Sequence, residues 1–141
     1  MLWTGIVCLV LALFGLLPQI RTKCTASLLP NSGVSGKTTS RRAVASSQYH
    51  DIGTVYRLLP DDTQGTPHQK FLVKTPSGRS LLIVHNIRLA SRIPDLQVND
   101  IVEFCGDYEP NDKGGLVHWT HDDPRRRHPD GWLLHKGRYY D

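Results

Sequence analysis

The chain has 141 residues, with 17 Lys and Arg against 13 Asp and Glu, which gives a formal net charge of +4 at pH 7. This length leaves room for one modest domain and a tail, so several large domains are excluded. Basic and acidic residues alternate instead of forming a long cationic block, so the charge favours acidic or phosphate-bearing partners only weakly.

The N-terminal segment predicts export. Residues 2–17 are uncharged and mostly apolar. At 1.5 Å per residue a helix over this run spans about 24 Å, which is less than the roughly 30 Å of a hydrocarbon core. We therefore expect residues 1–23 to form a hydrophobic helix that serves as a signal peptide or membrane anchor, in a periplasmic or membrane-anchored protein. Arg21 and Lys23 follow the run and no cation precedes it, so the orientation stays open.

Residues 24–50 predict a disordered linker before a folded domain at 51–141, because they are rich in Ser, Thr and Gly and lack periodic apolar positions. Cys24 lies in this linker and Cys105 in a predicted strand. An oxidising compartment permits a bridge between them. We interpret Cys105 instead as a small, buried apolar residue.

Short strand patterns repeat through the predicted domain. Apolar or alternating segments bounded by turn residues predict strands at 52–59, 68–75, 80–86, 98–108 and 115–121. The first three predict a meander, and the non-alternating residues 86–97 could hold one helical turn. Closing into a small barrel protects the edges of so few strands. We therefore predict an all-β, five-stranded OB-like barrel, with a small open β-sandwich as the alternative.

The stretch HWTHDDPRRRHPDGW at 118–132 concentrates residues with binding or catalytic chemistry. Strand alternation through 116–120 predicts that Trp119 lies in the core and that His118 faces the opposite way. An exposed platform on which a base or sugar stacks is the alternative for Trp119. The same alternation separates His118 from His121 unless the strand ends between them. Trp132 follows a turn and could either cap the barrel or line a groove.

A ligand-binding surface is predicted at one mouth of the barrel. Two histidines stand at ends of predicted strands and can converge with a third in the 118–132 stretch. The three consecutive arginines beside aromatic residues suit phosphate and stacking recognition of nucleic acid or an oligosaccharide. A purely structural role for the histidines and a solvated charged loop are the alternatives. The predicted ligand-binding residues are His68, His85, Asn86, His118, Arg125, Arg127 and Trp132.

A metal site is the second hypothesis. A divalent ion such as zinc takes three or four nitrogen, sulfur or oxygen ligands. The candidates are His118, His121 and His128, completed by Asp122 or Asp123. Such a site would make the chain a metal-dependent hydrolase or phosphodiesterase. The sequence leaves open whether the protein is an enzyme.

Four segments resemble an uncharacterised bacterial family catalogued as domain of unknown function 3465: GTVYRLLPDDTQGTPHQKFLV, LLIVHNIRLASRIP, VNDIVEFCGDYEPNDKGGLVHWTHDDP and HPDGWLLHKGRYY. The resemblance covers residues from about 51 to 140. It implies a small exported or membrane-tethered bacterial protein without an established activity, and it supplies no catalytic residues. The family pattern carries a second histidine where this chain has Asp122, which weakens a metal site built on histidines alone.

Overall fold

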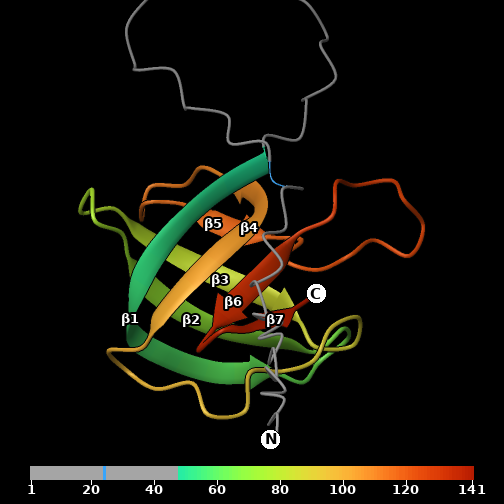
Figure 1. Ribbon diagram of the computed structural model, residues 1–141, viewed down its shortest axis with the longest axis horizontal. Helices are drawn as coiled ribbons and strands as arrows, with labels where there is room; N and C mark the ends of the chain where they lie inside the picture. The colour runs from blue at the N-terminus through green and yellow to red at the C-terminus, as the bar shows by residue number, and fades with distance from the viewer. Residues whose placement is uncertain (1–23, 25–47) are drawn as a thin grey trace, which may run out of the picture.

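The part of the chain that the computed structural model describes, Cys24 and residues 48–141, is all β (Figure 1). None of its residues forms a helix that could cross a membrane. The apolar run at 2–17 lies outside the described residues. The strands are β1 (Gln48–Asp62), β2 (His68–Lys74), β3 (Ser80–Asn86), β4 (Ile101–Glu109), β5 (Leu116–His118), β6 (Trp132–His135) and β7 (Arg138–Tyr140).

Five of the strands close into a ring. β1, β2 and β3 form the predicted antiparallel meander. β5 then lies parallel to β3 and antiparallel to β4, and β4 pairs with β1 to complete the ring. β1 can serve two neighbours because it is long: residues 48–54 pair with β4, and residues 54–62 pair with β2. β6 extends the sheet from β4, and β7 extends it from β6.

Side-chain alternation builds the core inside this ring. In β2 and β3 every second residue is buried and its neighbours are half-buried or exposed, as expected when successive side chains face opposite sides of a sheet. Burying one such apolar side chain stabilises the fold by about 1.5–3 kcal/mol. The fully buried apolar residues of this core are Val55, Phe71, Val73, Leu81, Ile83, Ile93, Val102, Phe104, Val117 and Leu133.

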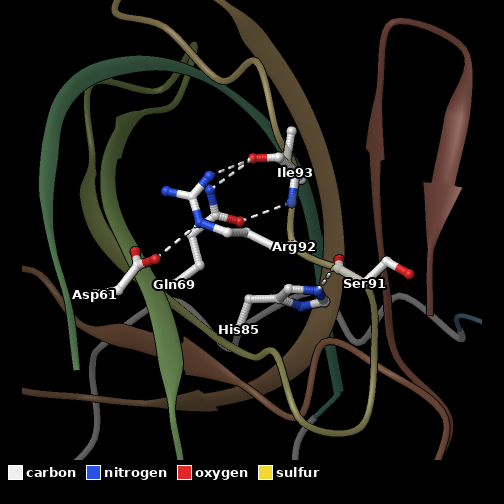
Figure 2. Close-up of polar contacts among 6 residues, drawn as sticks. All are labelled: Asp61, Gln69, His85, Ser91, Arg92 and Ile93. Carbon is white, nitrogen blue, oxygen red and sulfur yellow. Dashed lines mark hydrogen bonds and ion pairs between the residues drawn. The ribbon is translucent and has the colours of Figure 1, made fainter. Parts of the chain in front are cut away.

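The segment between β3 and β4, residues 87–100, covers one end of the core without forming a helix. Ile93 is fully buried there. The side-chain amide of Gln69 donates to the Ile93 carbonyl at 3.0 Å and accepts from the Ile93 N–H at 2.9 Å (Figure 2). Arg92 donates to Asp61 at 2.8 Å beside this pair. At the start of the segment the N–H groups of Leu89 and Ala90 donate to the Asn86 carbonyl at 3.3 and 3.1 Å, so a single helical turn follows β3, as the sequence allowed.

The β6–β7 hairpin is an addition to the five predicted strands. Its turn lies at Lys136 and Gly137, which both have positive φ, 49° and 78°. A two-residue turn of this kind matches the twist of antiparallel strands and favours glycine. The sequence signal was present as a Gly-containing pair between WLLH and RYY.

A disulfide joins Cys24 to Cys105 in β4, with the two Cα atoms 6.3 Å apart. Cys105 is fully buried, as expected. Its interpretation as an unbonded apolar residue was wrong, because the bridge fixes residue 24 against the domain. Everything between Cys24 and β1 lies outside the described residues.

Candidate functional site

A pocket of about 170 Å³ lies where the end of β3 meets the start of β2 and the end of β5. His68 and Asn86 are opposite each other in the β2–β3 register. His118 is the last residue of β5, which runs beside β3. The pocket is lined by His68, Val84, Asn86, His118, Trp119 and His121. Three residues that the sequence predicted for a ligand surface, His68, Asn86 and His118, therefore do come together.

The chain leaves the strand at Trp119, which has a φ of 52°. This left-handed conformation is uncommon for a bulky side chain. It breaks the alternation, so Thr120 is fully buried while Trp119 is only half-buried. The prediction that Trp119 belongs to the core was therefore wrong. Its indole instead stacks on the His128 ring, with centroids 3.8 Å apart and planes 13° apart.

His85 supports the pocket from inside the fold. Its Nε2–H donates to the Ser91 carbonyl at 3.1 Å (Figure 2). Because a carbonyl can only accept, Nδ1 is the nitrogen that accepts from the Thr120 hydroxyl, at 2.9 Å. Burial lowers the pKa of His85 to about 4, so its imidazole is neutral at neutral pH. The predicted ligand residue His85 thus lies behind the pocket and holds Thr120 in place.

His121 forms part of the pocket wall although it is only 2% exposed. Its Nδ1–H donates to the Asp122 carbonyl at 2.8 Å. This contact fixes the ring orientation and leaves Nε2 as the nitrogen available for other interactions. The ring centroid lies 5.3 Å from that of Trp119. His121 and Trp119 therefore form one aromatic wall at the end of β5.

The loop at 122–130, which we call the arginine loop, is organised around one buried carboxylate. Asp123 is 6% exposed and accepts the backbone N–H groups of Arg125, Arg127 and His128 at 2.9, 2.7 and 3.0 Å. The pKa of Asp123 is lowered, chiefly by the Arg125 N–H. All three arginines of this loop are exposed. The carboxylate therefore fixes the backbone from inside and leaves the guanidinium groups facing solvent.

The arginine loop and the pocket share a wall. His128 is stacked on Trp119, and its Nδ1 lies 3.5 Å from a carboxylate oxygen of Asp107. Asp107 is in turn the β4 partner of His118 in the antiparallel register. In Figure 1 the loop between β5 and β6 extends away from the body of the sheet. His128 therefore connects the arginine loop to the wall of the pocket.

The residues predicted to bind a metal do not gather at one point. His121 uses Nδ1 on a backbone carbonyl, His128 stacks on Trp119, and Asp122 is exposed. His118 has a carboxylate oxygen of Glu109 at 4.0 Å. Among the residues that the structure describes, no three His, Cys, Asp or Glu side chains are arranged to hold a metal ion. The geometry gives the metal-dependent hydrolase hypothesis no support.

Trp132 does not line this pocket. It is 3% exposed, and its ring centroid lies 5.2 Å from that of Tyr139 and 5.3 Å from that of His50. It packs with these rings on the outer face of β4, while its neighbour Leu133 points into the core, so it does not cap the end of the ring. Sequence reasoning missed Thr120, named Asp123 only as a possible metal ligand and placed Trp119 in the core. The Asp123-Pro124 pair was the available signal for the loop, because Asp before Pro favours a turn.

No curated protein matches the chain, and neither does any solved structure. A family model described as "Protein of unknown function (DUF3465)" matches residues 31–141. This range contains all seven strands, the pocket and the arginine loop. The chain therefore belongs to the DUF3465 family of proteins of unknown function.

Proposed function

We propose that this protein is an exported or membrane-tethered binding module that holds an anionic polymer, either a nucleic acid or an acidic oligosaccharide. The observation that carries the proposal is the continuity between the pocket and the arginine loop. The Trp119–His128 stack joins them, so ring recognition and charge recognition share one surface.

The fold supports the ligand class by analogy. We propose that the five-strand ring is an OB-like barrel. The strand order in the ring is β1-β2-β3-β5-β4, the β1–β4 pairing closes it, and β3 is parallel to β5. This topology supports the assignment. OB folds bind oligonucleotides and oligosaccharides on the face of their second and third strands. Because fold alone does not determine function, the argument depends on the residues of that face.

An apolar strip on the outer face leads toward the pocket. Leu72 of β2 lies opposite Leu82 of β3, and Leu82 lies beside Leu116 of β5. All three are half-buried. Val84 continues this face of β3 and lines the pocket. Flat apolar area beside aromatic rings suits stacking with bases or sugar rings, each contact contributing about 1–3 kcal/mol for bases.

The arginine loop supplies the charge. A guanidinium group pairs with phosphate, sulfate or carboxylate through two parallel hydrogen bonds. Because Asp123 already fixes the backbone at Arg125 and Arg127, binding orders less of the chain than a mobile loop would require. Asn86 adds an amide that can both donate and accept within the pocket.

The disulfide supports the exported part of the proposal. Bridges persist in oxidising compartments and are rare in the reducing cytosol. The apolar run at 2–17 supplies the targeting or anchoring segment that such a location requires.

Binding of the full chain to a labelled single-stranded oligothymidylate and to a sulfated oligosaccharide tests the proposal. Binding of each probe is measured at several salt concentrations. Replacing Arg125, Arg126 and Arg127 together with Gln should weaken binding at least tenfold at low salt and reduce the log–log salt slope by about 2, since each phosphate contact on a single strand adds about 0.7. The preferred probe then identifies the polymer class.

A matched variant controls for net charge. Replacing Lys74, Lys113 and Arg138 with Gln removes the same charge from exposed positions outside the pocket and the arginine loop. This control should retain more than half of the wild-type affinity. Equal losses in the two triple variants, or no binding of either probe at low salt, would overturn the proposal.

A further inference from the structure

The disulfide fixes residue 24 on the outer face of β4. Val102 and Phe104 point into the core, so Cys105, on the alternate side, points outward. Its β1 and β6 partners in the sheet are His50 and Trp132. The Cys24 attachment therefore lies on the β1-β4-β6 side of the ring. β2 and β3, which carry the apolar strip, are not neighbours of β4.

The same face carries an exposed apolar ridge between two shallow grooves. The grooves have volumes of about 380 and 470 Å³, and Ile52 and Ile101 line both. Ile52 is 41% exposed and Ile101 is 61% exposed. Lys74 lines the first groove and Lys136 the second.

The two acidic groups of the second groove are paired. Asp100 accepts from Nε2 of His135 at 2.8 Å, and Glu103 lies 2.7 Å from Nε2 of His50. Lys136 also pairs with Asp100, its Nζ 3.3 Å from the carboxylate. Besides these paired groups, the surface combines branched aliphatic side chains with the exposed Lys74. This combination suits the interface of an anionic bilayer, where apolar groups enter the headgroup layer and cations meet phosphate.

Chain length makes this face the one nearest to the apolar segment. Only residues 18–23 separate the run that ends at Leu17 from Cys24, and even fully extended they span about 20 Å. A domain of this size has a radius of gyration of about 12 Å and is therefore more than 30 Å across. Without the bridge, residues 18–47 would join Leu17 to the domain and could reach about 100 Å.

We infer that the Ile52–Ile101 face docks on an anionic lipid bilayer and that the Cys24–Cys105 bridge sets this pose. The inference rests on the membrane-tethered form of the proposed function. The apolar run lies in the bilayer, and Arg21 and Lys23 add positive charge to the short connection. The apolar strip of β2 and β3 then faces away from the lipid, where a polymer can reach it.

Spin labels on the full chain test this pose. In a Cys8→Ser background with the native bridge formed, one label is placed at Ile101→Cys and a control label at Lys70→Cys on the outer face of β2. The chain is reconstituted into vesicles of phosphatidylcholine with phosphatidylglycerol. Access of a water-soluble nickel quencher to the label at position 101 should fall at least threefold relative to detergent, while access at position 70 stays the same.

Two variants separate the causes. Adding Cys24→Ser and Cys105→Ser should restore quencher access at position 101. Because that variant could fold poorly, a second variant, Lys74→Gln with Lys136→Gln, keeps the bridge. It should restore at least half of the quencher access at position 101. Vesicles of pure phosphatidylcholine should have the same effect on the bridged chain. Equal access at both label positions in the bridged chain, or mass spectrometry showing that residues before Cys24 have been removed, would overturn the inference. Oligothymidylate binding by the same samples reports separately on the proposed function.

Discussion

Trp119 and His128 stack face to face, with ring centroids 3.8 Å apart, and thereby join the end of β5 to the arginine loop. The contact depends on a left-handed residue at Trp119, which turns the indole outward and places Thr120 inside. One backbone conformation thus produces both the aromatic wall of the pocket and the attachment of the loop. Strain of this kind, about 1–3 kcal/mol, persists where surrounding contacts determine it.

The two tryptophans should differ in their contribution to stability. Trp132→Ala should lower the free energy of unfolding by about 3–5 kcal/mol, because it removes a 3% exposed indole. Trp119→Ala should lower it by about 1 kcal/mol, because the indole is half-buried and its removal relieves the bulky left-handed residue. Urea unfolding measures both, and losses of equal size would contradict this placement of Trp119.

Asp123 should determine the order of the arginine loop. Asp123→Asn leaves one acceptor oxygen for three backbone N–H groups, so we expect a stability loss of about 1–3 kcal/mol and faster amide exchange at Arg125, Arg127 and His128. Asp122→Asn changes the same charge at an exposed position and is the control. Unchanged exchange in the Asp123 variant would show that the loop is ordered by other contacts.

His85 should make the fold less stable in mild acid. Its pKa is about 4 in the folded state and about 6.5 when unfolded, so the unfolded chain binds the proton first as pH falls. The stabilising contribution of a neutral His85 is fully present above the unfolded pKa and is lost as the pH falls from the unfolded pKa toward the folded pKa. The free energy of unfolding should therefore drop by about 2 kcal/mol from about pH 7 to about pH 5. His85→Gln should remove this part of the pH dependence, whereas His118→Gln should retain it. Denaturant unfolding at the two pH values gives the comparison, and parallel curves for wild type and His85→Gln would contradict the account.

The Cys24–Cys105 bridge should stabilise the domain. It closes a sequence separation of 81 residues, for which chain entropy predicts about 4.5 kcal/mol. Cys24→Ser should therefore lower the denaturant midpoint, and reducing agent should lower the wild-type midpoint to the same value. Cys8→Ser, which leaves the bridge intact, should have no effect. A wild-type midpoint that does not respond to reduction would mean that the bridge contributes nothing to equilibrium stability.

Periodicity in the sequence predicted most of the ring. The apolar runs bounded by turn residues predicted β2 to within one residue, and β3 likewise, and burial along HQKFLVK alternates strictly in the structure. The β6–β7 hairpin was missed because its strands are short, at four and three residues, which is too few for alternation to show. The bridge was underestimated because the sequence gives no distance between Cys24 and Cys105.

The candidate site was predicted only in part. His68, Asn86 and His118 were expected at one mouth because each stands at or near the end of a strand, a local feature that periodicity can detect. The position of Trp119 could not be predicted in the same way. It depends on a hydrogen bond between Thr120 and His85, 35 residues apart, which stabilises a break in the alternation. Long-range contacts of this kind leave no local pattern.

Amide chemical shifts of the full chain in detergent, recorded during titration with oligothymidylate or the sulfated oligosaccharide, test the central claim most directly, because they locate the ligand. The account predicts that the largest changes fall at His68, Asn86 and residues 118–128, and that they weaken as salt is added. Changes centred on Ile52 and Ile101, or spread evenly over the seven strands, would contradict it.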